Sequence, residues 1–290
     1  MKLTLIGTGA GEAYPGFWCS CENCSRARMT GGKDLRGNCT ALLNDDLLLD
    51  MNHHFFEMAP RLGIWPDRLR HLLVTHPHQD HFTPYLLGQR AMDPAYAELP
   101  VRERHARISP CFTALPMLDV YGNACVEAAL ADVPGLMEKA EVCRFAFHRI
   151  EAGVSFEMGN YRVTPVRSRH TDIPDYTLNY IIGQEGRRLL YATDTGGYDP
   201  DMLPLILACR YDAVVVEGTF GLGLSVEGHM SLEKDRAFRT LLLKNGCITE
   251  DTPVVLTHLC PHWTPPHAEY APLVEASGML LGYDGMTLKI

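Results

Sequence analysis

The segment Thr75-His76-Pro77-His78-Gln79-Asp80-His81 follows directly after the apolar run Leu72-Leu73-Val74. It places several imidazoles and a carboxylate together at the end of a predicted strand. His76 and His78 are two residues apart and can bind one metal ion, while Asp80 and His81 can reach a second ion close by. Because chance matches become rarer with each added ligand, the segment predicts a two-metal site, for which hydrolysis is the default chemistry.

Further metal-binding side chains follow other strand-like stretches of the chain. His170 comes after residues 161–166, Asp194 after 189–193, and His258 after 253–257. Each stretch is apolar or alternating and is bounded by turn residues, as strands are. A carboxylate can bridge two cations, and neutral imidazoles can fill the remaining positions. We therefore predict Asp194 as the bridging ligand.

This pattern of His-x-His-x-Asp-His followed by single His, Asp and His residues resembles the metallo-β-lactamase superfamily, and the resemblance spans nearly the whole chain. It implies an α/β fold, the four-layer αββα sandwich. It also implies two divalent metals, zinc or manganese, and a metal-bound hydroxide as nucleophile. The implied ligands are His76, His78 and His170 for one metal, Asp80, His81 and His258 for the other, and Asp194 between them.

The length of 290 residues fits one metallo-β-lactamase-like domain over residues 1–290, with an insertion at about 93–116. Apolar periodicity predicts helices at residues 83–92, 123–131, 199–208 and 231–244. Strands are expected near residues 2–6, 39–43, 46–50, 70–75, 117–121, 142–147, 161–166, 177–182, 188–193, 213–217, 253–257 and 286–290.

The charge and hydropathy pattern bears on partners and location. The formal charge of −9 disfavours long nucleic acid as a partner and favours a small anionic phosphodiester substrate held by metals. Apolar residues make up 46% of the chain, yet no run reaches the ~18 residues of a membrane span. We expect a cytoplasmic protein that does not associate with membranes.

A second metal site is predicted from the cysteines. Cys19, Cys21 and Cys24 lie on one short loop, a spacing suited to a structural zinc that lacks only its fourth ligand. Reduced loop cysteines, an iron-sulfur group or a redox role are the alternatives. The candidates for the fourth ligand are Cys39, Cys260 and His262, of which we favour His262.

The opening Gly7-Thr8-Gly9-Ala10-Gly11-Glu12-Ala13-Tyr14-Pro15 and the cysteine loop narrow the family. Together they resemble the PhnP-like cyclic phosphodiesterases of the carbon-phosphorus lyase pathway, and PqqB-like proteins have a similar opening. The first resemblance implies phosphonate metabolism and a structural zinc completed by a histidine shortly after the last catalytic one. In this chain the interval from His258 to His262 differs from that pattern by one residue. The family resemblance also suggests a homodimer, an assembly that the sequence neither supports nor excludes.

The general acid is expected at His229, in Glu227-Gly228-His229-Met230-Ser231, where Ser231 is placed to begin a helix. The segment resembles the Gly-His-x-Ser of RNase Z, and Glu217 resembles the carboxylate that orients this histidine. With the ligand Asp80, these residues form the predicted catalytic set. Asp50 is expected to anchor the histidine loop from within the fold.

The leading hypothesis is a dinuclear phosphodiesterase that hydrolyses a small, cyclic phosphorylated sugar or nucleotide. The alternatives are an RNase Z-like endoribonuclease, a PqqB-like zinc protein with a binding role, and a lactone or thioester hydrolase. Histidine and aspartate suit zinc, manganese and iron alike, so the ligand types do not identify the catalytic metal.

Overall fold

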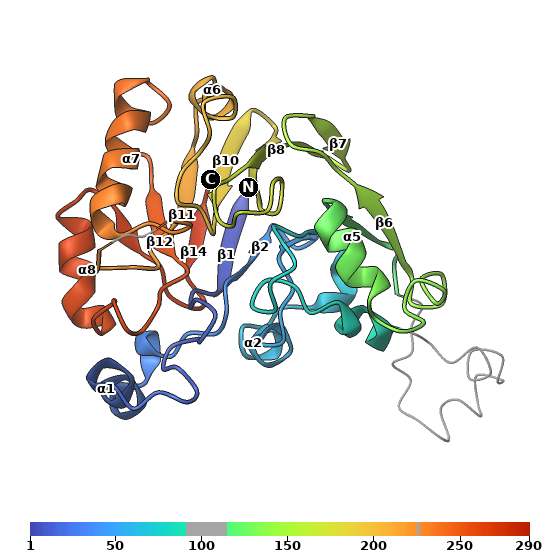
Figure 1. The fold of residues 1–290 in the computed structure, drawn as a ribbon, viewed down its shortest axis with the longest axis horizontal. Coiled ribbons are helices and arrows are strands. Elements are labelled where there is room, and N and C mark those ends of the chain that lie inside the picture. Colours follow the sequence, from blue (N-terminus) through green and yellow to red (C-terminus); the bar gives the residue numbers. More distant parts are fainter. Residues whose placement is uncertain (91–114, 225–226) are drawn as a thin grey trace.

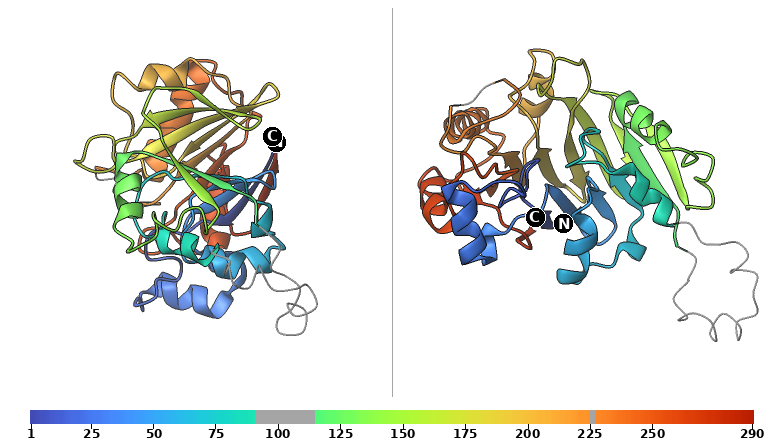
Figure 2. Two further views of the ribbon diagram at one scale, coloured as in Figure 1. Left: turned by 90° about the vertical axis from the view of Figure 1, so that its right-hand side faces the viewer. Right: turned by 60° about the horizontal axis from the view of Figure 1, so that its bottom comes forward.

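The computed structural model describes residues 1–90, 115–224 and 227–290, and the insertion predicted at 93–116 falls almost wholly outside these ranges. The strands form two seven-stranded sheets. The first contains, in spatial order, β14 (Thr287–Lys289), β1 (Lys2–Gly7), β2 (Thr40–Leu43), β3 (Leu47–Leu49), β4 (His71–Leu73), β5 (Leu118–Gly122) and β6 (Phe145–Arg149). The second contains β13 (Leu280–Leu281), β12 (Val254–Thr257), β11 (Ala213–Glu217), β10 (Arg187–Ala192), β9 (Leu178–Gln184), β8 (Tyr161–Arg167) and β7 (Phe156–Met158). The two chain ends lie side by side, where the Met1 ammonium donates to the Ile290 carbonyl at 2.8 Å (Figures 1 and 2).

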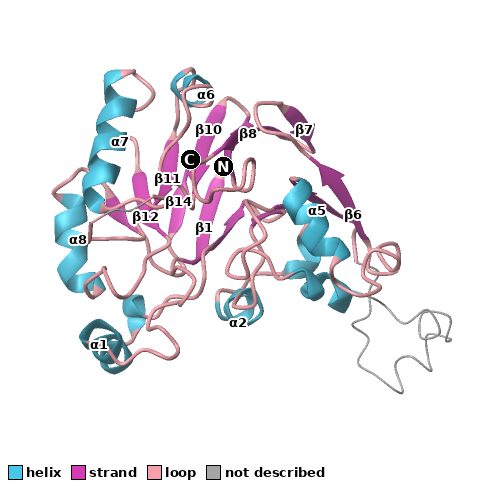
Figure 3. Ribbon diagram, viewed as in Figure 1, coloured by secondary structure: helices cyan, strands magenta, loops and turns pink. Residues whose placement is uncertain are grey.

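Helices cover the outer faces of both sheets (Figure 3). The α-helices are α1 (Glu22–Thr30), α2 (Phe55–Arg61), α5 (Ala124–Ala131), α6 (Leu203–Leu207), α7 (Leu232–Lys244) and α8 (His267–Glu275). Short 3₁₀ helices are η1 (Gly32–Asp34), η2 (Pro66–Arg68) and η3 (Pro84–Arg90). The predicted helices at 123–131 and 231–244 are confirmed.

Two helix predictions need correction. The segment predicted as a helix at 83–92 is the 3₁₀ helix η3 as far as Arg90. Its buried side chains, Leu86 and Leu87, are adjacent and do not form the stripe that stabilises an α-helix. The helix predicted at 199–208 shrinks to α6, since Pro204 has no amide hydrogen and fits only the first turn.

Three apolar clusters define the four layers, which confirms the predicted αββα sandwich. One cluster fills the space between the sheets and includes Leu5, Leu73 and Tyr191. A second packs the first sheet against α2, η3 and α5, and a third packs the second sheet against α6, α7 and α8. Strand β11 is buried throughout because both of its faces are covered, which is why its sequence reads as a continuous apolar run.

The strands that carry the predicted site end at one edge of the sandwich. β3 and β4 are parallel, as are β10, β11 and β12, so their carboxyl ends point the same way. Asp50, Asp194 and His258, just past these ends, have φ values of 62°, 53° and 56°. This left-handed conformation is uncommon outside glycine and concentrates at functional sites. The predicted site residues therefore meet where the chain turns sharply out of both sheets.

Candidate metal centre and active site

The histidine loop is anchored by Asp50, as predicted. Asp50 Oδ1 accepts a hydrogen bond from the Thr75 amide at 2.7 Å, and Asp50 Oδ2 lies 2.7 Å from His81 Nδ1. All three side chains are buried. Because His81 Nδ1 donates to this carboxylate, its Nε2 atom is the one directed toward the other predicted ligands.

The first group of converging imidazoles is His76, His78 and His170. His76 Nε2 and His170 Nε2 lie 2.9 Å and 3.2 Å from His78 Nδ1. His170 reaches the group from the loop after β8, in the second sheet, and its Nδ1 donates to the Gly228 carbonyl at 3.2 Å. One nitrogen from each ring lies within 4.8 Å of the others, a spacing that suits one metal.

Asp80, His81 and His258 form the second group, again with ligand atoms within 4.8 Å of one another. His258 Nε2 lies 3.4 Å from Asp80 Oδ2. Asp194 sits between the two groups, since its Oδ2 is 2.8 Å from His81 Nε2 and its Oδ1 is 3.9 Å from His170 Nε2. This position is the one expected of a bridging carboxylate.

The electrostatics of the cluster fit divalent cations. Although burial opposes it, the carboxylates of Asp194, Asp80 and Asp50 hold the pKa of His81 well above its usual value. Burial, and then the positive charge of His81, depress the pKa of His76 well below its usual value. His81 Nε2 and Asp194 Oδ2 are buried and lie 2.8 Å apart, and neither has any other hydrogen-bond partner in the described ranges. Buried carboxylates that require positive charge, beside the neutral imidazole of His76, are a donor set for metals.

His229 lies against this cluster in the turn before α7. Its Nδ1 is 3.0 Å from both carboxylate oxygens of Glu217 and 3.9 Å from Asp194 Oδ1. Burial works against the charged form, but the Glu217 carboxylate raises the pKa of His229 to about 9. The imidazole is therefore protonated at neutral pH, the form that a general acid needs.

Glu217 is held rigidly at the end of β11. It is fully buried, its Oε1 accepts a hydrogen bond from the Thr195 amide at 2.5 Å, and its Oε2 accepts one from the Thr219 hydroxyl. The Thr219 hydroxyl also lies 2.8 Å from His258 Nδ1, so it connects Glu217, the partner of His229, to a predicted metal ligand. Sequence reasoning missed Thr219, because no spacing rule distinguishes this threonine from others at strand ends.

The cysteine loop forms a separate cluster beside α1. Sulfur and nitrogen atoms of Cys19, Cys21 and His262 lie within 4.8 Å of one another, with Cys19 Sγ 3.8 Å from His262 Nδ1. Cys24 is buried in α1, and its Sγ accepts a hydrogen bond from the Gly16 amide at 3.3 Å. The arrangement suits the tetrahedral thiolate and imidazole set of a structural zinc.

The alternative fourth ligands are placed differently. Cys39 lies in the core, 3.6 Å from both Tyr191 Oη and Thr257 Oγ1, and cannot serve the cysteine loop. Cys260 is near His262 and Glu12 and groups with those two residues. His262 is thus the candidate that the structure brings to Cys19 and Cys21.

A two-sheet sandwich with histidines and aspartates gathered at one edge defines a metal-dependent hydrolase fold. The sequence profile of the beta-lactamase superfamily domain matches residues 48–259, and the chain belongs to the metallo-β-lactamase superfamily. Coenzyme PQQ synthesis protein B of Azoarcus sp. (strain BH72) is 24% identical over 235 residues, covering 76% of this chain and 73% of that protein.

Solved structures show the same fold. A diphosphatase from the PhnP family superimposes with a TM-score of 0.72 at 20% identity, covering 100% of this chain and 97% of its own. Zn²⁺-bound PqqB from Methylobacterium extorquens superimposes with a TM-score of 0.72 at 18% identity, and the match covers 100% of both chains. The short form of human tRNase Z superimposes with a TM-score of 0.62 at 17% identity, covering 100% of this chain and 99% of its own. The profile match confirms the predicted superfamily, and the solved structures confirm its fold.

The helices in the described ranges include none that is long and apolar enough to cross a membrane. The cytoplasmic location, the homodimer and the single-domain organisation stay predictions.

Proposed function

We propose that the protein is a dinuclear metal-dependent phosphodiesterase that acts on a small, cyclic phosphorylated sugar or nucleotide. The observation that carries the proposal is the pair formed by His229 and Glu217, joined at 3.0 Å and set against the predicted bridging carboxylate Asp194. Opening a phosphodiester expels an alkoxide, a poor leaving group that requires a proton as the bond breaks. The protonated imidazole supplies that proton next to the metal-binding cluster.

Two divalent metals bound by the His and Asp cluster would stabilise negative charge on the phosphate oxygens and lower the pKa of water toward neutrality. The chain's own residues do the rest. Asp50 and the Gly228 carbonyl fix the orientation of His81 and His170. Glu217 accepts a hydrogen bond from the protonated Nδ1 of His229, which leaves Nε2 as the nitrogen that passes a proton to the leaving oxygen.

A second candidate is a PqqB-like binding role, which the curated relatives favour. The site contains more groups than a binding role requires: seven side chains cluster as predicted metal ligands, and a protonated histidine lies beside them. RNase Z-like cleavage of RNA is disfavoured by the net charge of −9. Thioester hydrolysis uses the same metal centre but expels a thiolate, which requires an acid less strongly. Lactone hydrolysis also expels an alkoxide, and the substrate panel below separates it from phosphodiester hydrolysis. A role in phosphonate metabolism follows only from the PhnP-like relationship.

A substrate panel tests the proposal. Protein loaded with manganese or zinc is assayed on bis(p-nitrophenyl) phosphate, a cyclic ribose phosphate, a homoserine lactone, a thioester and a structured RNA. We expect turnover of the first two compounds. Turnover of the lactone, thioester or RNA alone would assign one of the alternatives, and inactivity on all five with two bound catalytic metals would favour the binding role.

A further inference from the structure

A cavity of about 580 Å³ opens beside the predicted metal cluster, between the loop that precedes α1 and the start of α2. Gly11 lines it, and a Cβ atom at Gly11 would lie 3.6 Å from Asp80 Oδ2, so the cavity adjoins the second metal group. Its volume is that of a site for one small organic molecule. A phosphate held at the cluster would leave the rest of its molecule beside this space.

Two aromatic side chains stand at the rim of the cavity. Phe17 and Trp18 both line it and are 79% and 94% exposed. Their rings form an edge-to-face pair with centroids 4.8 Å apart, which leaves a broad indole face open to solvent. Adjacent exposed aromatic residues at the mouth of a cavity have no role in the packing of this fold.

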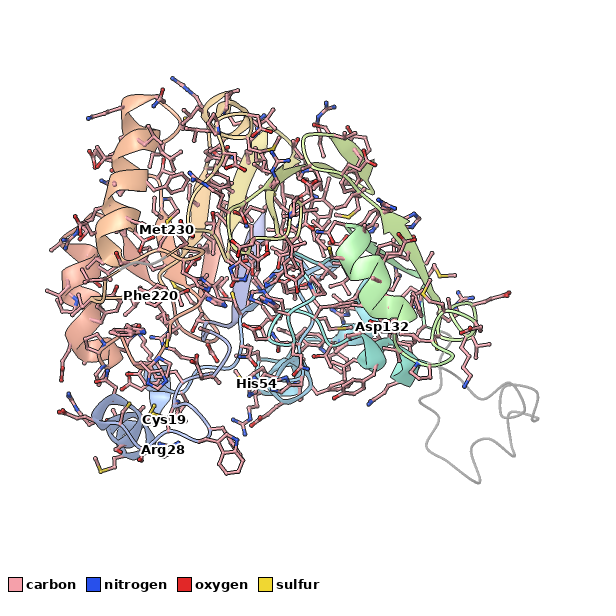
Figure 4. The ribbon with its side chains drawn as sticks, in the orientation of Figure 1. Cys19, Arg28, His54, Asp132, Phe220 and Met230 are labelled. Carbon is pink, nitrogen blue, oxygen red and sulfur yellow. The ribbon has the colours of Figure 1, made fainter. Side chains whose placement is uncertain are left out.

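The loop bearing these rings is fixed in place. The Arg28 guanidinium donates to the Cys19 carbonyl at 2.6 Å and to the Gly16 carbonyl at 2.7 Å, which closes the loop from both sides. Figure 4 shows Cys19 and Arg28 close together beside α1 and His54 beside α2. The backbone that carries the two rings is therefore fixed, so ordering the loop on ligand binding costs little.

Polar atoms line the cavity opposite the rim. His54 Nδ1 lies 2.7 Å from Asn38 Oδ1, and Asn38 Nδ2 donates to the Ala10 carbonyl at 2.6 Å. Asn38 contacts Nδ1 through its backbone amide and its side-chain oxygen, which leaves Nε2 of the half-buried His54 ring to hydrogen-bond a ligand. His53 is exposed next to it, with the two ring centroids 4.3 Å apart. Such groups suit the edge of a planar heterocycle.

The charge of the cavity disfavours a second phosphate. The residues that line it include the Glu12 carboxylate, neither lysine nor arginine, and Cys19 and His262 of the cysteine cluster. A smaller cavity of about 250 Å³, lined by His170, contains the cations Arg169 and Lys234 together with Asp172 and Glu227. Cations line only this smaller cavity of the two, so an uncharged ring is favoured on the Trp18 side.

We propose that the 580 Å³ cavity binds the base of a nucleotide substrate, stacked on Trp18 and contacted at its edge by His54, while the phosphate lies at the metal cluster. This assignment rests on the proposed phosphodiesterase function and narrows its substrate class from phosphorylated sugars or nucleotides to nucleotides. Stacking on an aromatic side chain tolerates any base, so the site selects for a base without requiring a particular one.

The test compares two esters with the same leaving group, thymidine 5′-p-nitrophenyl phosphate and methyl p-nitrophenyl phosphate. We expect the wild-type ratio of kcat/KM, nucleoside over methyl, to fall about tenfold in Trp18→Ala, the loss typical of one stacked base. Trp65→Ala, which removes an indole that is 62% exposed elsewhere on the surface, should leave the ratio unchanged. A ratio that is the same in Trp18→Ala and wild type overturns the inference while leaving the phosphodiesterase intact.

A binding measurement keeps the test independent of turnover. Titration calorimetry on zinc-loaded protein compares thymidine 5′-monophosphate with methyl phosphate. We expect the mononucleotide to bind at least about tenfold more tightly, and this advantage to disappear in Trp18→Ala and persist in Trp65→Ala. If neither ester is hydrolysed, the proposed function fails, and equal affinity of the two phosphates would then overturn the base site as well.

Discussion

Side chains that do not themselves bind the metals decide the geometry of the metal cluster. Asp50 lies beneath His81 with its Oδ2 atom 2.7 Å from Nδ1, and its other oxygen accepts a hydrogen bond from the Thr75 amide. Because Asp50 is fully buried, no water can take over these contacts. The orientation of His81, and with it the second metal position, depends on this one carboxylate.

Substitution of Asp50 by asparagine should therefore weaken one metal position. Outer carboxylates that orient histidine ligands typically contribute about 10–100-fold to metal affinity. We expect Asp50→Asn to lower zinc affinity by that factor at one of the two catalytic positions, measured by competition with a chromogenic chelator. Asp119→Asn is the matched control, since Asp119 forms the same kind of bond with His148, at 2.8 Å, on the surface. Equal losses in both variants would contradict the anchoring role.

The residues of the cluster could be predicted because each ligand type is rare and stands at a strand end. Asp194 and His258 follow apolar runs that the structure confirms as β10 and β12. Thr219 and Trp18 could not be predicted in this way. Their importance arises from contacts between segments far apart in the chain, and neither residue type marks a site by itself.

At the scale of elements, α7 carries a buried carboxyl group, Asp235, near Glu217. Leu232, Phe238 and Leu242 of this helix are buried against the second sheet. Asp235 lies on the same buried face, is 1% exposed, and has no hydrogen-bond partner for either oxygen in the described ranges. Burial, followed by the charge of Glu217, raises the pKa of Asp235 well above its usual value.

The raised pKa of Asp235 gives a sign to the pH dependence of stability. The folded state holds the carboxyl proton more tightly than the unfolded state, whose pKa stays near the ordinary value of 3.8. The stabilising contribution is therefore complete below that pH and is lost as pH rises toward the folded pKa. We expect Asp235→Asn, which stays neutral, to exceed wild type in unfolding free energy by about 1–3 kcal/mol at pH 8 and by little at pH 4.

Urea unfolding of both proteins between pH 4 and pH 8 measures this difference. The metal-binding residues titrate in the same way in both proteins, so their contribution cancels in the difference between the two unfolding free energies. Glu233→Gln, in the same turn but exposed, is the control and should run parallel to wild type. If Asp235→Asn also runs parallel, Asp235 is ionised in the folded protein and the argument from burial is wrong.

The cysteine loop is the second element with its own prediction. Structural zinc sites lend their binding free energy directly to folding of the loop that surrounds them. We expect Cys21→Ser to lose one of three zinc equivalents, counted by elemental analysis, and to make the loop before α1 sensitive to protease. Cys209→Ser, at a half-buried cysteine outside the loop, should keep all three. Retention of three equivalents by Cys21→Ser would exclude Cys21 as a ligand.

Some elements could not be predicted. Sequence patterns did not predict α1, α2 or α8; Pro60 and Pro272 lie inside the last two, and proline normally ends a helix. The short edge strands β7 and β13, which pair with their neighbours over only a few residues, were not predicted either. Such short pairings are decided by the sheet they join and not by local propensity.

At the scale of the whole molecule, the site depends on the two sheets meeting at one edge. The Leu178 amide donates to the Thr75 carbonyl at 2.9 Å, which ties β9 of the second sheet to the histidine loop of the first. The Leu259 amide donates to the Thr8 carbonyl, also at 2.9 Å, which ties the loop after β12 to that after β1. Sequence patterns predicted both sheets, but which loops meet follows from their packing.

The central claim is that His229 protonates a leaving alkoxide beside a two-metal cluster. The most direct test follows the opening of a cyclic ribose phosphate by phosphorus NMR, for wild type and His229→Ala at matched metal content. We predict turnover by wild type and a fall in kcat of about 10²–10⁴-fold in the variant, with a smaller fall on p-nitrophenyl esters, whose leaving group needs little protonation. An unchanged kcat in His229→Ala, or no ring opening by wild type with both catalytic metals bound, would contradict the account.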